Sequence, residues 1–548
     1  MISKTIFAVP EKTIKKKSSG LARATIIIAL FSLLAKLLGL LRNNIFTATF
    51  GAGDTLDVYF AAFRLPDFLY NLLILGTLSA ALIPVFIEYL VKDEEEAWKI
   101  VNSVLNIIFL TIASCSAILA VFAPHLGAWI APGFSAEKKA AMVELTRIMM
   151  LTPILFSLSS IFSSVLNSFK RFTLVAAVPL FYNLSVIFGV LVLYPIFGIK
   201  GLAYGVVLGA FLHMFLQIPS LVSVGYRWRP VVDVSSAGFR KIAKMFIPRI
   251  FSMDAGQIGL LIATVIGSSL ASGSIAVYNL ASDLQAIPLG IVAVSFAIAA
   301  FPYLSEAVAK KDNETYKEVF NGTLSQILFV IIPVSALMIV LRAQIVRLAY
   351  GRGELFDWQA TIATLTVFGV FALSLFAQSL VPLLARAFYA LHNTLIPVIA
   401  GLVSIAVNII AAIFFIGFFP ENLKVVGLAT AFSVSAIVNF LILFVWLEFK
   451  FGNLVDRQLI FKLEKILIGT LLAGIACYAA LFSTVRFVDN HTYLGLFTQT
   501  IVALAFGLAV YLAAGYALNL AEVRHLITWV KIWMRKLRSA FVKSPGGI

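Results

Sequence analysis

Long apolar stretches recur along the whole chain, and each one is long enough to cross a lipid bilayer. A helix needs roughly 20 mostly apolar residues to span the hydrocarbon core, and the chain offers about fourteen stretches of that kind. The 548 residues are 61% hydrophobic and only 12% charged, whereas charged residues make up roughly 25% of a soluble domain. The sequence therefore predicts an all-α integral membrane protein with about fourteen transmembrane helices.

The distribution of charge inside these stretches indicates how the spans are grouped. Nearly all of the intramembrane charge lies in the first twelve spans, and the last two contain almost none. The simplest division is a core of two six-helix lobes around a central cavity, followed by two added C-terminal helices. The predicted spans begin at Ala24, Val58, Val101, Met142, Leu174, Gly201, Ile242, Ser274, Val319, Ala360, Thr394, Val425, Leu463 and Tyr493. The predicted segments are a basic N-terminus at 1–23, a first lobe at 24–225, a basic linker at 226–241, a second lobe at 242–449, the two added helices with their preceding loop at 450–519, and a basic tail at 520–548.

Lysine and arginine residues gather in every second loop, and this sets the predicted orientation. The basic N-terminus, the linker at 226–241 and the C-terminal tail fall on one side, which the positive-inside rule assigns to the cytoplasm. One basic loop, Arg342 to Arg352, falls on the other side. Much of the net charge of +16 is therefore a topology signal, strengthened by attraction to anionic lipid of the inner leaflet, and does not indicate nucleic-acid binding.

Two apolar runs near the N-terminus carry ionisable residues at lipid depth. Lys36 and Arg42 lie in the first run, and Asp57, Arg64 and Asp67 lie in the second. A charge near the bilayer centre costs at least roughly 2.5 to 3.5 kcal/mol, so such residues usually face the interior of a helix bundle or a wet cavity. They predict a charged cavity inside the membrane, which is typical of a transporter.

A row of this kind suits a lipid-linked diphosphate as cargo. Arginine binds phosphate oxygens bidentately and stays charged when water is removed. Asp57 and Arg64 are seven residues apart, so a continuous helix would present both on one face, with Asp67 three further along. Structural alternatives stay open: Arg64 and Asp67 can neutralise each other, Lys36 can extend to a surface, and Asp57 can cap a helix. Arg42 has no acid nearby in the sequence, which favours a functional role.

Five segments carry motifs whose order and spacing run across most of the chain. They lie at Leu37–Leu69, Ser163–Leu184, Ser272–Ser305, Tyr350–Phe356 and Ala385–Val398. Together they resemble the MurJ/MviN-type lipid II flippase family of the multidrug/oligosaccharidyl-lipid/polysaccharide exporter superfamily. The resemblance implies fourteen helices in two lobes around a V-shaped cavity, in the plasma membrane of a bacterium. It also implies alternating access that carries a polyprenyl-linked peptidoglycan precursor outward for cell-wall synthesis.

The resemblance also implies which residues face the cargo. The family's cationic cavity positions match Lys36, Arg42 and Arg64, and its acidic position after the turn at 51–54 matches Asp57. These side chains are expected to contact the pyrophosphate and the sugar head group. Asp67 and Asn71 complete the predicted substrate-binding set of the first two spans.

The chain departs from the family pattern in the second and eighth spans. Tyr70-Asn71 and then Leu75-Gly76 stand where the family has a basic pair followed by Glu-Gly. The eighth span has Ser282-Asp283 in place of an Asp-Arg pair, and Ala286 in place of a glutamate. Two cavity arginines are absent, so the identity of the transported lipid stays open.

The seventh span offers a compensating charge. Arg249 and Asp254 both lie in it. If Arg249 approaches Asp283, the missing cation has moved from one helix to its neighbour, and both residues join the predicted substrate-binding set. Asp254 and Asp283 are also the candidate acids for coupling to a monovalent cation.

The sequence indicates a secondary transporter without a cofactor. It has no phosphate-binding GxxxxGK[ST] loop, and its five histidines lack metal-ligand spacing. No catalytic residue is predicted, and the membrane potential or a cation gradient is the expected energy source. Three other functions stay open: transport of another lipid-linked glycan or amphiphile, a scaffold that recruits cell-wall synthesis proteins, and a membrane glycosyltransferase.

Overall fold

The computed structural model describes residues 18–73, 77–250, 255–351, 353–452, 454, 457–489, 492–524 and 528. Within them the chain is helical apart from short connections, and no strand occurs. Eleven helices are long and apolar enough to cross a membrane, which confirms the predicted all-α membrane class. Each of the eleven covers one predicted span. The other three predicted spans are covered by α1 (Ser18–Phe50), by α2 (Asp54–Ala62), α3 (Arg64–Leu73) and α4 (Thr77–Lys92), and by α12 (Ala237–Ile250) and α13 (Ala255–Gly267). The total of fourteen stays a prediction.

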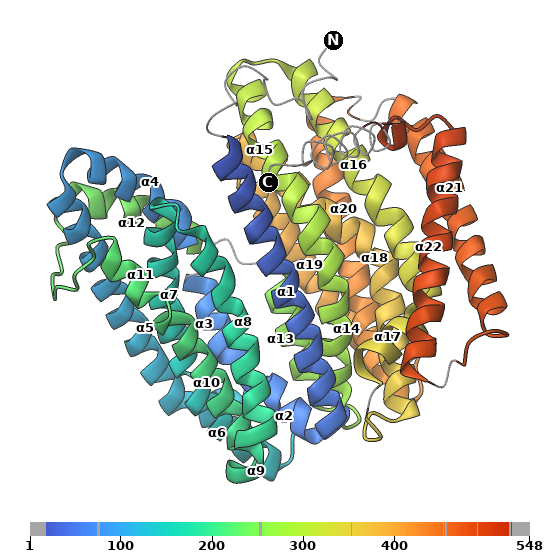
Figure 1. Cartoon of the computed structure of the whole chain (residues 1–548), viewed down its shortest axis with the longest axis horizontal. Helices are drawn as coiled ribbons and strands as arrows, with labels where there is room; N and C mark the ends of the chain where they lie inside the picture. Colours follow the sequence, from blue (N-terminus) through green and yellow to red (C-terminus); the bar gives the residue numbers. More distant parts are fainter. Residues whose placement is uncertain are drawn as a thin grey trace, which may run out of the picture. The chain divides into compact units, whose positions relative to one another are not determined.

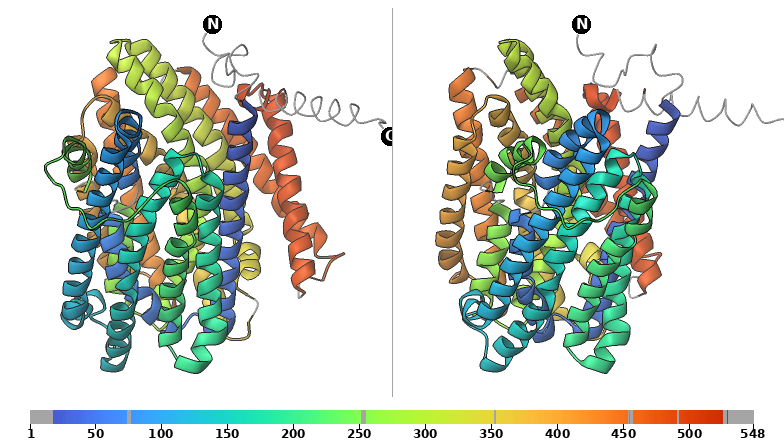
Figure 2. Two further views of the ribbon diagram at one scale, coloured as in Figure 1. Left: turned by 60° about the vertical axis from the view of Figure 1, so that its left-hand side comes forward. Right: turned by 90° about the vertical axis from the view of Figure 1, so that its left-hand side faces the viewer.

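The helices pack into two compact units. The first comprises Met1–Gln257 and Thr264–Ile275, and the second comprises Ile258–Ala263 and Ala276–Ile548. In each unit the helices run side by side as a bundle (Figures 1 and 2). The helices of the first unit are α1 (Ser18–Phe50), α2 (Asp54–Ala62), α3 (Arg64–Leu73), α4 (Thr77–Lys92), α5 (Glu94–Ile130), α6 (Ala136–Met149), α7 (Leu151–Ser168), α8 (Phe172–Phe188), η2 (Gly189–Leu193), α9 (Tyr194–Phe197), α10 (Lys200–Phe215), α11 (Ile218–Ser223) and α12 (Ala237–Ile250).

The second unit contains the rest of the described helices, apart from α13 (Ala255–Gly267), whose residues are divided between the units, and the first two residues of α14, which belong to the first unit. They are α14 (Ser274–Pro288), η3 (Leu289–Ala293), α15 (Val294–Ala309), α16 (Asn313–Val340), α17 (Arg342–Tyr350), α18 (Trp358–Ala390), α19 (Leu395–Ile416), η4 (Glu421–Leu423), α20 (Lys424–Phe451), α21 (Arg457–Thr484) and α22 (Tyr493–Ala517). The last two, which correspond to the predicted added helices, pack against each other and against α16. The Tyr511 hydroxyl of α22 donates to the carbonyl of Phe329 on α16 at 2.7 Å.

The predicted second span is interrupted between α2 and α3. Pro66 explains the break, because proline lacks the N–H that would bond to the carbonyl four residues earlier, and its ring crowds that carbonyl. The carbonyl in question belongs to Ala62, the last residue of α2. It accepts instead from the Thr146 hydroxyl of α6 at 3.2 Å. The expectation of one continuous helix from Asp57 to Arg64 is therefore wrong.

Small residues let the helices of the first unit approach closely where α8 continues into η2. A Cβ atom on Gly205 of α10 would lie 2.6 Å from the Cα of Gly189, and one on Gly201 would lie 2.4 Å from the Leu193 carbonyl. In membranes such glycine contacts are a common basis of helix association, since lipid provides no hydrophobic force between helices.

The segment at 225–236, which we call the strap, lies along the start of α5. It joins α11 to α12, and all of it except its first residue falls within the predicted basic linker at 226–241. The Asn102 carboxamide of α5 accepts from the Tyr226 hydroxyl at 2.9 Å and from the backbone N–H of Arg229 at 3.1 Å. Its amide group donates to the carbonyl of Arg227 at 3.1 Å. Asn102 thus binds one hydroxyl, one backbone N–H and one backbone carbonyl of the strap.

One helical turn further along α5, Asn106 repeats this arrangement. It donates to the carbonyls of Arg229 and Val231, both at 2.9 Å, and accepts from the Trp228 indole N–H at 3.1 Å. Beyond the strap, α12 packs against α4 and α5. The start of the seventh predicted span therefore packs in the first unit, while the predicted lobe boundaries stay a prediction.

We expect Asn102→Ala to loosen the strap. The substitution removes three hydrogen bonds to the strap, and leaving the hydroxyl of the buried Tyr226 unsatisfied costs about 1–3 kcal/mol. Amide hydrogen exchange of residues 225–236 should accelerate, and the melting temperature should fall. Asn313→Ala at an exposed site is the control. Unchanged exchange in the strap would contradict the assigned contacts.

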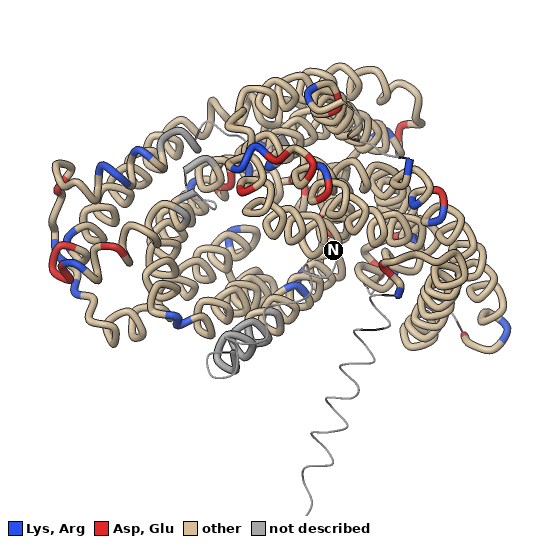
Figure 3. Tube along the Cα trace, turned by 90° about the horizontal axis from the view of Figure 1, so that it is seen from above, with Lys and Arg blue, Asp and Glu red and all other residues tan. Residues whose placement is uncertain are grey.

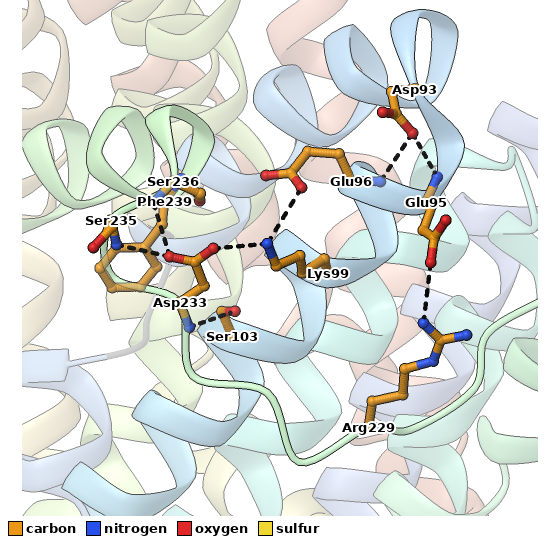
Figure 4. A network of polar contacts seen from close by, with 10 residues as sticks. All are labelled: Asp93, Glu95, Glu96, Lys99, Ser103, Arg229, Asp233, Ser235, Ser236 and Phe239. Carbon is orange, nitrogen blue, oxygen red and sulfur yellow. Dashed lines mark hydrogen bonds and ion pairs between the residues drawn. The ribbon is translucent and has the colours of Figure 1, made fainter.

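The strap also carries an ion pair that predicts a pH dependence. The ammonium of Lys99 lies 2.9 Å from the carboxylate of Asp233. Figure 4 shows the other bonds of Asp233: its backbone N–H donates to the Ser103 hydroxyl, and its carboxylate accepts from the backbone N–H groups of Ser235 and Ser236. The hydrogen bond from Lys99 lowers the pKa of Asp233 below its ordinary 3.8. A lowered pKa stabilises the folded strap above the ordinary value, and this contribution disappears as the pH falls through the folded-state pKa.

Strap amides should therefore lose protection on acidification, after correction for the intrinsic exchange rate. In Asp233→Asn, which has no carboxylate, the protection should depend less on pH over the same range. Equal pH dependence in the two proteins would exclude the ion pair as the cause.

Candidate functional site

The predicted charged residues of the first two spans all lie in the first unit. The structure places Lys36 and Arg42 on α1, Asp57 on α2, and Arg64, Asp67 and Asn71 on α3. Asp57 and Arg64 are buried, and the others are half-buried. Figure 3 shows how few charged residues the helices carry, so these positions are exceptions along apolar helices.

Arg42 is bound by two amide oxygens. The carboxamide oxygen of Asn43 accepts from its Nε at 3.1 Å and from its Nη2 at 2.9 Å. The carboxamide oxygen of Asn183, on α8, accepts from its Nη1 at 3.3 Å. Both acceptors are neutral, so the guanidinium is oriented while its charge is not cancelled.

Asp57 is tied to the turn between α13 and α14. Its Oδ2 accepts from the backbone N–H of Gly273 at 2.7 Å. The N-cap of α2 is Gly53, without a side-chain capping bond, so Asp57 does not cap that helix. Next to it, Asp54 accepts from Lys138 at 2.5 Å and from the Ser272 hydroxyl. The two aspartates fix residues 272–273 to the start of α2.

Arg64 contacts the same segment of chain. Its Nε donates to the Thr264 hydroxyl at 2.6 Å, within the buried part of the first unit. Asp57 and Arg64 thus both bond to residues 264–275, although α2 and α3 are separate helices. The predicted row of Asp57 and Arg64 on one helix face stays a prediction, because the two residues lie on separate helices and bond to different residues, Gly273 and Thr264.

Aromatic rings adjoin the charged residues. Tyr70 of α3 packs against Phe156 of α7 with ring centroids 5.5 Å apart, and Phe156 packs against Tyr182 of α8 at 5.4 Å. Tyr182 lies within electrostatic range of Arg42 and Asp67. Tyr70 is one of the positions at which the resemblance leads one to expect a base, and the chain has an aromatic ring there.

A further polar network joins α7 to α10. The Ser159 hydroxyl lies 2.6 Å from Nδ1 of His213, and the Gln217 amide donates to that hydroxyl at 2.5 Å. Ser163 donates to Gln217 at 2.9 Å. The sequence pattern indicates only that His213 lacks metal-ligand spacing, and it does not predict these partners. Among the described residues, no group of three His, Cys, Asp or Glu is placed to hold a metal ion.

The predicted residues of the seventh and eighth spans are less fully described. Asp283 is exposed on α14. The side chain of Arg249 and the whole of Asp254 lie outside the described residues, so the approach of Arg249 to Asp283 and the cation-coupling role of Asp254 stay predictions. Near Asp283 in sequence, Gln285 accepts from Gln378 of α18 at 3.2 Å.

Sequence reasoning missed the uncharged partners of the charged residues. Asn43, Asn183, Thr264 and Gly273 each bond to a predicted site residue. The available signal was weak: Asn43 and Asn183 are amides inside apolar spans and lie in two of the segments that resemble the family. Polar side chains at such positions commonly serve helix packing alone.

The model of the family described as lipid II flippase MurJ matches residues 46–498. The chain belongs to this family. A relative described as a probable lipid II flippase MurJ, from Buchnera aphidicola subsp. Acyrthosiphon pisum, is 29% identical over 494 residues, which cover 89% of this chain and 94% of that protein. The family assignment confirms the resemblance found in the sequence.

Solved structures agree with this assignment. A structure described as lipid II flippase MurJ in an inward closed conformation is 26% identical, with a TM-score of 0.74, and the match covers 92% of this chain and all of that one. An inward-facing transporter of the multidrug resistance MATE family is similar with a TM-score of 0.63 at 13% identity over 79% of this chain, which shows a shared fold alone. The transporter fold expected for the family is thereby confirmed.

Proposed function

We propose that this chain flips lipid II, a polyprenyl-diphosphate-linked peptidoglycan precursor, from the cytoplasmic to the outer leaflet of a bacterial plasma membrane. The family assignment supports this cargo. The observation in the structure that carries the proposal is Arg42, a cation on an apolar helix whose hydrogen-bond acceptors are neutral. Such a guanidinium can replace the water of a diphosphate with charge-assisted hydrogen bonds.

The remaining residues fit the same cargo. The head group needs fixed donors in place of its water, and the apolar polyprenyl tail can stay in lipid throughout. Tyr182, which packs with Phe156 and through it with Tyr70, lies within electrostatic range of Arg42, and an aromatic ring there could pack against a sugar. The chain would act as a transporter and not as an enzyme, because moving the head group requires no bond to be broken.

Alternating access would supply the two openings in turn. The energy would come from the membrane potential, which contributes roughly 2.3 kcal/mol per charge per 100 mV, or from a monovalent cation bound through Asp254 or Asp283. Both termini would lie in the cytoplasm, where the basic linker and tail meet anionic lipid. Cell-wall synthesis proteins are the partners proposed for these termini.

Complementation tests the proposal. Expression of the chain should restore growth and normal cell shape to bacteria depleted of their own lipid II flippase. Purified chain in vesicles should then expose labelled lipid II on the opposite leaflet. Correct membrane insertion without rescue and without flipping would overturn the proposed cargo.

A second cargo is favoured by one observation. The family resemblance expects an arginine at position 283, and the chain has the exposed Asp283 there, which changes the sign of the charge offered to a head group. Another polyprenyl-linked glycan with a different charge distribution is the alternative. The same vesicles loaded with other lipid-linked glycans distinguish the two, since only the true cargo should be flipped.

A further inference from the structure

Asn183 connects α8 to two places on α1. Its carboxamide oxygen accepts from Nη1 of Arg42 at 3.3 Å. Its amide group donates to the carbonyl of Ala35 at 3.4 Å and to the carbonyl of Pro179, on its own helix, at 3.1 Å. The side chain is buried. The donor bonds orient the carboxamide so that its oxygen faces the guanidinium.

Because the Asn183 acceptor is a neutral amide oxygen, it orients Arg42 without forming an ion pair with it. A guanidinium has five N–H donors and no acceptor. Asn43 accepts one N–H from Nε and one from Nη2, and Asn183 accepts one N–H from Nη1. Within the described part of the chain no carboxylate pairs with Arg42 at ion-pair distance. The guanidinium therefore keeps its full charge and has N–H groups left for another anion.

We propose that Asn183 is a positioning residue for transport: it holds the Arg42 guanidinium oriented but not neutralised, for the diphosphate of the cargo. This inference rests on the proposed function. An aspartate in its place would have nearly the same shape and would form an ion pair with Arg42. The cargo would then have to displace a carboxylate before it could bind.

The test compares Asn183→Asp with Asn183→Leu in purified full-length protein, with lipid II in detergent micelles as the probe. Both variants lose the two bonds donated by the amide group, and only aspartate adds a charge. We expect Asn183→Asp to weaken lipid II binding at least tenfold and Asn183→Leu a few-fold. We also expect the ionic-strength dependence of binding to be smaller in Asn183→Asp than in the unmodified protein, because neutralisation removes the attraction that salt screens.

Asn313→Asp is the control, because Asn313 is an exposed asparagine on α16 of the other unit. Its binding should equal that of the unmodified chain. If the unmodified chain fails to bind lipid II, the proposed function fails. If it binds and Asn183→Asp binds equally well with the same salt dependence, the inference about Asn183 fails. Should Asn183→Asp not fold, the Leu variant decides: unchanged affinity overturns the positioning role, and a few-fold loss supports it.

Discussion

Replacing Arg42 by alanine will reduce lipid II binding about 10- to 100-fold, since a hydrogen bond to a charged group contributes about 1.5–3 kcal/mol. The substitution removes the cation that Asn43 and Asn183 orient, and no charged group takes its place. Transport should fall in proportion, because the head group then enters the membrane without its strongest donor. Flipping of labelled lipid II in vesicles is the direct measurement.

Two further variants separate charge from geometry. Arg42→Lys keeps the charge but lacks the planar fork that binds two phosphate oxygens together, so an intermediate loss is expected. Arg240→Ala removes a cation from an exposed site on α12 and should leave flipping unchanged. If Arg42→Ala protein at normal abundance flips lipid II at the unmodified rate, Arg42 is a packing residue and the proposed site must lie elsewhere.

The class of fold followed from the sequence because lipid imposes strong demands. A backbone in hydrocarbon must satisfy its own hydrogen bonds, so long apolar runs can only be helices. A charge inside such a run is costly in lipid and usually faces a bundle interior or a wet cavity. This cost identified Lys36, Arg42 and Arg64 as candidates. The interruption of the second span could also have been placed, since Pro66 removes a defined hydrogen bond.

The neighbours of these residues could not be predicted in the same way. Asn183 lies 141 residues from Arg42, and Gly273 lies 216 residues from Asp57. Helical periodicity reports which face a side chain occupies and carries no information on which distant helix packs there. An asparagine in an apolar span is compatible with several roles, and only the oxygen facing a guanidinium distinguishes them.

Gly273→Val should destabilise the protein by about 2–5 kcal/mol, combining left-handed backbone strain and overpacking. Gly273 has a φ of +86°, and a Cβ atom there would lie 2.0 Å from the carbonyl oxygen of Ala52. The turn would have to move away from the start of α2, and the bond from its N–H to Asp57 would break. Gly322→Ala is the matched control, since its Cβ would meet nothing within 4 Å and alanine favours a helix.

Thermal unfolding of the purified variants measures this difference, and amide hydrogen exchange of residues 272–274 reports the local change. The Gly273 N–H donates to Asp57 in the unmodified chain, so its exchange should be slow, and Gly273→Val should accelerate exchange at this turn. Asp57→Asn should act in the same direction but more weakly, because a neutral oxygen still accepts from the Gly273 N–H. Equal melting temperatures for Gly273→Val and Gly322→Ala would mean that the turn at 272–273 is not held against α2, and the bond between Asp57 and Gly273 would have to be abandoned as a constraint on the site.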